Sequence, residues 1–245
     1  MISIKVDIDT RGMQQFMEFS ERRLRASVAT ALTRTAADAR KAWQAEMRTK
    51  LDRPTPYTIN SVRTEKATAE SLVAVVAIKD QGEGVLPAEY LRTQQVGGDR
   101  NLRKFERALV SAKAMPPGYK VVPSRYALLD AYGNISRAQI VSVLRSIGGN
   151  VLSPGYQRVI SKSASKRAGK SKPYLAVWPE AKSGLAPGVY QSKGRELQQV
   201  FAYVRSVTYR QRIDLYQTAR DIVGQQLQAQ FDRAMRESAA RLAAK

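Results

Sequence analysis

Residues Gln198–Val204 read QQVFAYV, and they carry the strand pattern around which the second half of this 245-residue chain is organised. The apolar residues of this stretch alternate between two faces, Val200, Ala202 and Val204 on one and Phe201 and Tyr203 on the other. A period of two is that of a β-strand. Two more apolar segments, 173–178 and 186–191, precede it and are separated by glycine and proline residues. The spacing predicts an antiparallel meander of three strands.

Long amphipathic helices are predicted on both sides of this meander. Between residues 13 and 47, apolar residues recur at spacings near three, four and seven, and Pro54 follows as a helix stop. A second apolar stripe runs through 209–242 and includes Leu227 and Phe231. Because both stripes are longer than one small sheet would cover, we expect Leu227 and Phe231 to lie at a contact between subunits.

The remaining elements are predicted from shorter patterns. Ile2–Ile8 alternates apolar and polar residues as a half-buried strand does. Leu72–Ile78 is a nearly continuous apolar run, which favours a strand in a central position. A short basic helix is expected over 101–114, with Leu102, Phe105 and Leu109 on its inner face, and another over 136–147.

Together these elements predict an α+β fold, in which an antiparallel sheet is flanked by long N- and C-terminal helices. Residues 116–173 begin at a Pro-Pro-Gly turn and end in a basic segment, as an insertion would. We therefore predict a core domain made of 1–115 and 174–245, and an inserted lobe of 116–173 that holds a short helix and a basic loop.

The composition argues against most catalytic chemistry. The chain has no histidine and no cysteine, which removes the usual zinc ligands and the usual general base near neutral pH. Neither a paired-acid motif nor a nucleophile motif is present. We expect no catalysis, no cofactor and no bound metal. Apolar runs long enough for a membrane span are missing as well, so no membrane partner is expected.

Charge is the strongest compositional signal. The chain has 41 basic and 21 acidic residues, a formal net charge of +20. The purest basic run, residues 161–172, reads SKSASKRAGKSK and carries Lys162, Lys166, Arg167, Lys170 and Lys172. Its small spacers offer no base-reading side chain, so contact with DNA would rest on phosphates and be independent of sequence. The alternatives are an acidic partner surface or a solvated loop that binds nothing.

Three stretches, taken in order, carry a resemblance to a known family. The first is 53–62, RPTPYTINSV; the second is 87–92, PAEYLR, with Gly97-Gly98 and the helix 104–109 behind it; the third is 185–191, LAPGVYQ, with 197–204 behind it. In this order the chain resembles the minor tail protein Z family of tailed bacteriophages, which are tail-completion or neck components. The segment 116–173 is larger than the family leads us to expect.

The resemblance implies a structural virion protein that forms a ring at the head–tail joint, with its basic surface near packaged DNA. It implies a homo-oligomer, six-fold or alternatively twelve-fold, whose partners are neighbouring neck and tail proteins. Assembly would take place in the host cytoplasm.

Two other functions are compatible with a basic chain. A sequence-independent DNA-binding architectural protein would be expected to carry a compact recognition element, and none is evident. A nuclease needs clustered acidic metal ligands. The acids here are scattered singly along the chain: Asp38, Glu46, Glu70, Glu89, Asp99, Glu106 and Asp130.

Overall fold

The computed structural model describes residues 21–82, 85–147, 151–152, 174–181 and 183–244. It confirms the α+β class with predominantly antiparallel pairing. The chain divides into two compact units, one formed by residues up to Gly97 together with those from Arg210 onward, the other by Gly98–Tyr209. The predicted strand Ile2–Ile8 lies outside the described residues.

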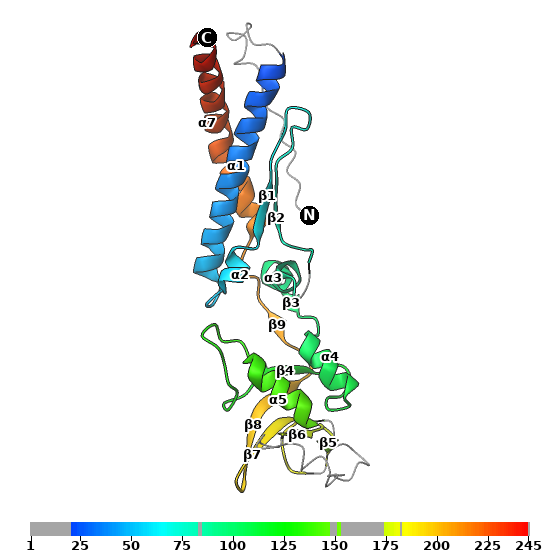
Figure 1. The fold of residues 1–245 in the computed structure, drawn as a ribbon. Helices are drawn as coiled ribbons and strands as arrows, with labels where there is room; N and C mark the ends of the chain where they lie inside the picture. Colours follow the sequence, from blue (N-terminus) through cyan, green and yellow to red (C-terminus); the bar gives the residue numbers. More distant parts are fainter. Residues whose placement is uncertain (1–20, 83–84, 148–150, 153–173, 182, 245) are drawn as a thin grey trace. The chain divides into compact units, whose positions relative to one another are not determined.

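The first unit is built on two long helices, α1 (Glu21–Lys50) and α7 (Leu215–Ala243), which lie side by side (Figure 1). They run antiparallel, because Arg34 contacts Glu237 whereas Glu46, further along α1, contacts Thr218 near the start of α7. Small and apolar side chains fill the space between them: Ala31, Phe231, Ala234 and Met235 are buried, with Leu24 and Val28 beside them. The apolar stripes of the two helices thus pack against each other within the chain.

Local chemistry sets the helix ends. After α1 the chain turns into the short helix α2 (Pro56–Ile59), where the Thr55 hydroxyl accepts a hydrogen bond from the Thr58 N–H at 3.1 Å. Helix α7 begins at Leu215, since the Asp214 carboxylate accepts from the Gln217 N–H at 2.9 Å. The predicted start near residue 209 was therefore too early; Tyr209 belongs to a short strand instead.

A hairpin and a third helix complete this unit. Strands β1 (Val62–Glu65) and β2 (Val75–Ile78) pair antiparallel, and α3 (Pro87–Val96) follows. One cluster of buried residues joins these elements to α1 and α7, and its largest members are Trp43, Met47, Val62, Leu91, Ile213 and Leu215. The predicted strand Leu72–Ile78 is shorter in the structure, because Leu72 and Val73 are 36% and 39% exposed and precede β2. In the described part of the chain β2 pairs with β1 alone, so a central position is not observed.

The second unit contains a five-stranded sheet in the order β4-β8-β7-β6-β5. All its neighbours are antiparallel except β5 and β6. The strands are β4 (Lys120–Pro123), β5 (Val151–Leu152), β6 (Tyr174–Val177), β7 (Gly188–Lys193) and β8 (Glu196–Val204). Two-residue strands β3 (Gly98–Asp99) and β9 (Thr208–Tyr209) pair separately. The meander predicted from the sequence is β6-β7-β8.

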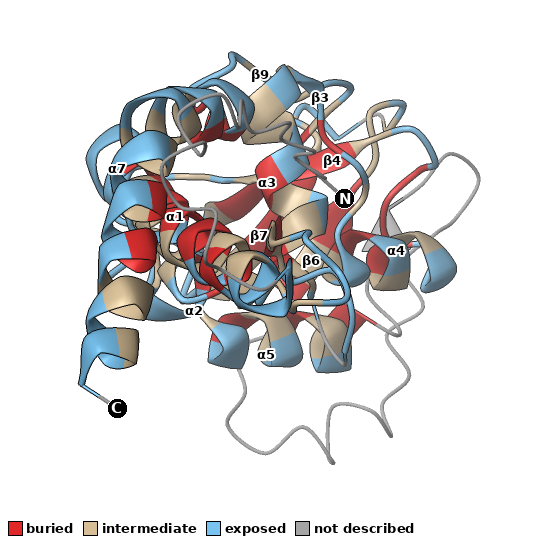
Figure 2. Cartoon of the chain, turned by 90° about the horizontal axis from the view of Figure 1, so that it is seen from above, coloured by how far each residue is buried: buried red, intermediate tan, exposed pale blue. Residues whose placement is uncertain are grey.

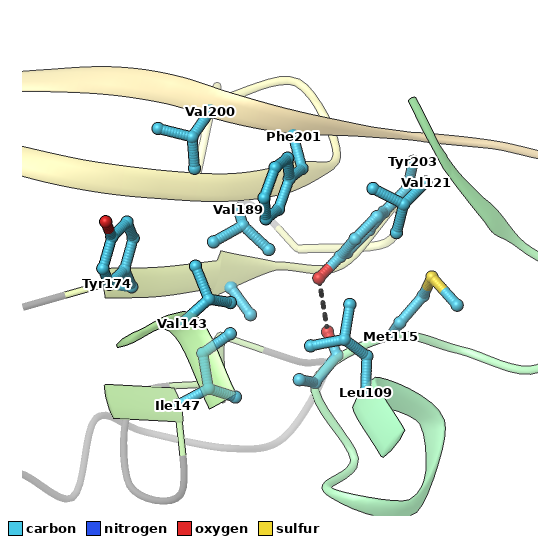
Figure 3. Packing of buried hydrophobic residues seen from close by; sticks show 12 residues of the cluster. Leu109, Met115, Val121, Val143, Ile147, Tyr174, Val189, Val200, Phe201 and Tyr203 are labelled. Carbon is cyan, nitrogen blue, oxygen red and sulfur yellow. Dashed lines mark hydrogen bonds between the residues drawn. The ribbon is translucent and has the colours of Figure 1, made fainter. Parts of the chain in front are cut away.

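Helices α4 (Lys104–Ser111) and α5 (Arg137–Ile147) pack with this sheet around one core, shown in Figure 3. Leu109, Val143, Ile147, Val189 and Phe201 are fully buried there. The Tyr203 hydroxyl donates to the Ala114 carbonyl at 3.1 Å, which satisfies the one polar atom that this side chain brings into the core. Figure 2 shows the outward turns of α5 and α7 as exposed.

The predicted lobe 116–173 covers the middle of this unit, and the unit extends beyond it on both sides. Val121 and Val143, from the predicted lobe, share a core with Leu109 before it and Phe201 after it. The predicted strand Leu72–Ile78, observed as β2, and the strands of the meander belong to separate sheets.

Candidate functional surfaces

The five basic residues predicted to contact a polyanion, Lys162, Lys166, Arg167, Lys170 and Lys172, lie outside the described residues. The expectation for them stays a prediction. Any basic surface in the described part of the chain must therefore be formed by other Lys and Arg residues.

The two residues predicted at a subunit contact occupy different environments. Phe231 is 8% exposed and packs within the chain against Ala31, Ala234 and Met235. Leu227 is half-buried on α7. The packing partners of Phe231 within the described chain are thus intramolecular, and its role at a subunit contact stays a prediction. Leu227 alone keeps accessible surface.

Polar contacts along the α1–α7 seam use several carboxylates. The Arg34 guanidinium binds Glu237 through two hydrogen bonds, at 3.2 and 2.7 Å, and Arg233 contacts the same carboxylate at 3.0 Å. Further along, the Gln230 amide donates to Asp38 at 2.9 Å. The Arg34 and Arg233 guanidinium groups hold the pKa of Glu237 below its ordinary value. This seam fixes the register of the two helices.

Glu46 is the buried carboxylate of the seam. It accepts from Lys50 Nζ at 2.7 Å, from the Thr218 hydroxyl at 2.5 Å and from the Asp214 backbone N–H at 2.9 Å. Burial alone raises the pKa of Glu46, but these three donors lower it by more, so the pKa lies below its ordinary value. The group is ionised and structural at neutral pH.

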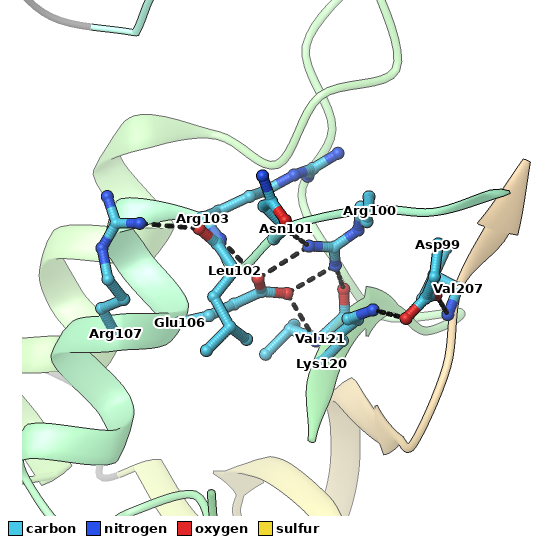
Figure 4. Close-up of polar contacts among 10 residues, drawn as sticks. All are labelled: Asp99, Arg100, Asn101, Leu102, Arg103, Glu106, Arg107, Lys120, Val121 and Val207. Carbon is cyan, nitrogen blue, oxygen red and sulfur yellow. Dashed lines mark hydrogen bonds and ion pairs between the residues drawn. The ribbon is translucent and has the colours of Figure 1, made fainter. Parts of the chain in front are cut away.

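A second buried carboxylate, Glu106, organises the second unit (Figure 4). Arg100 donates to both of its oxygens, at 2.7 and 2.5 Å, and is itself buried. The backbone N–H groups of Arg103 and Val121 donate to the same carboxylate, each at 2.7 Å. Burial alone raises the pKa of Glu106, but Arg100 and the two N–H groups lower it by more, so the pKa lies below its ordinary value.

This arrangement assembles a sheet edge rather than a reactive site. Glu106 holds the first turn of α4 through Arg103 and the start of β4 through Val121, while Arg100 donates to the Val121 carbonyl at 2.9 Å. Beside it, Lys120 pairs with Asp99, which also accepts from the Val207 N–H at 2.8 Å. Arg100 and Lys120 are thus each in contact with an acidic side chain. Among the described residues, no group of three or more acidic side chains is placed to hold a metal ion.

One side of α1 carries a set of exposed cations. We call it the α1 basic face, and it consists of exposed Arg22, Arg23, Arg40, Lys41 and Arg48. Ala26 and Thr30, between these cations on the same side, are small and exposed, whereas Thr33, which accepts from the Ala67 N–H at 3.1 Å, is half-buried. The apolar spacing predicted the helix but did not by itself show this alignment of cations. The signal was available in the 18-residue spacing of Arg22 and Arg40, because 18 residues make about five helical turns.

The described helices include none that combines the length and apolar character needed to cross a membrane. Comparisons of the sequence with protein-family models and with curated proteins, and of the fold with solved structures, find no match.

Proposed function

We propose that this chain is a structural virion protein of a tailed bacteriophage, a ring-forming neck or tail-completion component at the head–tail joint, with a basic surface near packaged DNA. In this role it catalyses nothing and binds neighbouring neck and tail proteins. The proposal rests on the three stretches that resemble the tail protein Z family and on the charged surface of α1.

Contacts between the three stretches support taking them together. The Tyr90 hydroxyl, from the second stretch, lies 3.0 Å from the Thr58 hydroxyl of the first. The Phe105 ring, on the helix that continues the second stretch, packs edge-to-face against Phe201 of the third, with ring centroids 5.4 Å apart. Residues that carry the resemblance are therefore packing residues within each unit, as expected if they specify a family fold.

The observation that carries the proposal furthest is the α1 basic face. A protein near packaged DNA is expected to present cations without interleaved acids, since phosphate neutralisation supplies sequence-independent affinity. The face fits that expectation over most of its length, with Asp38, 3.5 Å from Lys41, as an acid at its margin. Among the exposed large apolar residues of the described chain, Tyr216 and Tyr57 are each 49% exposed and available for contacts with other proteins.

Electron microscopy of the purified protein, paired with a light-scattering mass, tests the ring directly. We expect closed rings with six-fold symmetry, or twelve-fold as the alternative, and a mass that is the matching multiple of 27.2 kDa. Because a neck protein can assemble only on its neighbours, the decisive measurement is a map of the intact particle. A particle map without ring density for this chain would overturn the proposal.

A sequence-independent DNA-binding architectural protein is the second candidate, and the same basic face favours it. The two functions differ in where the protein is found. An architectural protein remains on cellular DNA after lysis and is missing from purified particles, whereas the virion protein copurifies with particles in a fixed ratio. Quantitative mass spectrometry of particles and of the DNA fraction separates them.

A further inference from the structure

The α1 basic face is ordered by helix geometry. Arg22 and Arg40 share one azimuth, and so do Arg23 and Lys41, because each pair is 18 residues apart. Arg48 extends the same side toward the end of the helix. At a rise of about 1.5 Å per residue, the cations span roughly 39 Å along the axis, close to one turn of duplex DNA.

Each acidic residue of α1 is hydrogen-bonded to at least one residue outside the basic face. Asp38 accepts from Gln230 of α7, and Glu46 accepts from Thr218 and from the Asp214 N–H. Glu21 is bonded to Arg25 at 3.0 Å. The basic face is therefore predominantly positive, although acids flank it at its margins: Asp38 lies 3.5 Å from Lys41, and Glu70 interacts electrostatically with Arg22.

Three guanidinium groups of this face are free in the described part of the chain, and Arg22 lies within electrostatic reach of Glu70. Within the described ranges, Arg23, Arg40 and Arg48 have neither an ion pair nor a hydrogen bond to another side chain. By contrast, Arg34 is held by Glu237 and Arg63 by Glu65 and Asp80. A free guanidinium presents a planar fork of donors that matches a phosphate group bidentately.

The composition of the face also limits its occupant. None of the exposed large apolar residues of the described chain lies on α1. Insertion into a lipid interface requires such residues, and so does the desolvated centre of a typical protein–protein contact. Long cations with small, exposed side chains such as Ala26 and Thr30 between them instead fit an extended polyanion.

We propose that the α1 basic face binds the sugar–phosphate backbone of duplex DNA, without reading bases. Arg23, Arg40 and Arg48 donate to phosphate oxygens, and Arg22 and Lys41 add to the local positive field. This inference names the surface that faces DNA in the proposed virion role and rests on that role for its biological setting. It assigns DNA contact to residues other than the basic segment 161–172.

The test compares two variants that each remove three charges from a helix of the same unit. The first is Arg23→Gln, Arg40→Gln and Arg48→Gln on α1; the matched control is Arg220→Gln, Arg236→Gln and Arg241→Gln on α7. All six residues are exposed. The probe is a fluorescent duplex of about four helical turns, measured by anisotropy over a potassium chloride series. Circular dichroism and urea midpoints confirm that both variants fold as the parent does.

We expect the parent to bind with an affinity that falls steeply with salt. Three phosphate contacts contribute about 2.7 to the slope of log K against log salt, so the α1 variant should lose up to that amount and the α7 variant very little. Two duplexes of unrelated sequence should bind equally, since phosphates carry no sequence information.

Several results would overturn the inference. Equal slope losses in the two variants would mean that the charge acts diffusely, and an unchanged slope in the α1 variant would place DNA contact elsewhere. Poly-glutamate that competes as well as DNA at equal charge would favour an acidic protein as the occupant. Absence of the chain from particles would defeat the virion role but leave this measurement standing, so the two failures are distinguishable.

Discussion

The Thr218 hydroxyl donates a hydrogen bond of 2.5 Å to the carboxylate of Glu46, across 172 positions of the sequence. The same carboxylate accepts from the Asp214 N–H at 2.9 Å, immediately before α7 begins. Lys50, one turn further along α1, closes the arrangement at 2.7 Å. One buried acid thus joins the end of α1 to the start of α7, and the register of the helix pair depends on its charge.

Acid should weaken the fold through this group. Because the pKa of Glu46 and that of Glu106 are lowered in the folded state from 4.5, both groups contribute stability that is present above about pH 5 and is lost as the pH falls toward and through the lower folded values. Urea midpoints should be constant from pH 7 to about 5 and decline below that. Glu46→Gln should reduce the acid-dependent decline, whereas exposed Glu196→Gln should leave it unchanged. A decline that begins near neutral pH would contradict this assignment.

Breaking the Arg100–Glu106 pair should destabilise the second unit. Glu106→Gln leaves the buried Arg100 guanidinium without its counter-charge, and we expect a loss of about 3–5 kcal/mol of unfolding free energy. Trp178, whose indole N–H donates to the Lys113 carbonyl at 3.2 Å, reports on this unit, while buried Trp43 reports on the other. Fluorescence of Trp178 in a Trp43→Phe background measures the loss.

The double variant Arg100→Met with Glu106→Leu sharpens that prediction. For many buried pairs, joint replacement by apolar residues is nearly neutral. Here the N–H groups of Arg103 and Val121 also depend on the Glu106 carboxylate, so they lose their acceptor in the double variant. We expect it to remain clearly less stable than the parent. If the double variant were as stable as the parent, the ion pair with Arg100, and not the hydrogen bonds from the Arg103 and Val121 N–H groups, would be the main role of Glu106.

Sequence periodicity predicted the elements whose signal is local. The long stripes gave α1 and α7, and alternation around Phe201 gave the meander. The start of α7 was misplaced because the Asp214 cap, and not the apolar pattern, determines it. The extent of the second unit was not predictable in this way, since it depends on contacts such as Phe105 with Phe201, which local patterns do not encode.

The functional surfaces were predictable in part. The α1 basic face could be predicted from the sequence, because the apolar stripe of an amphipathic helix determines which side faces solvent and the residue spacing determines which cations lie on that side. Glu106 and Arg100 look like ordinary surface residues in the sequence, and only the folded chain reveals that both are buried. Similarly, the stripe that contains Phe231 was visible, but whether its partner is α1 or another subunit is a tertiary fact.

Gly188 should tolerate no side chain. A Cβ at this position would lie 2.1 Å from the Phe201 carbonyl oxygen, on the neighbouring strand. Gly188→Ala must therefore push β7 and β8 apart, at a cost of about 1–3 kcal/mol. Gly224→Ala is the matched control, because a Cβ there meets nothing within 4 Å. Within helix α7, that change should stabilise by about 0.5–1 kcal/mol. Thermal unfolding of the two variants should shift in opposite directions.

Phe231 and Leu227 provide the test that separates core from interface. Phe231→Ala opens a cavity between α1 and α7, and we expect about 3–5 kcal/mol of lost stability in the isolated chain. Leu227→Gln should cost far less, because Leu227 is only half-buried. If Leu227 contacts a neighbouring subunit, Leu227→Gln lowers the light-scattering mass at a given concentration while its urea midpoint stays near that of the parent. The opposite pattern for Phe231, an unchanged midpoint with lost association, would mean that its main packing partner is another subunit and that the intramolecular assignment is wrong.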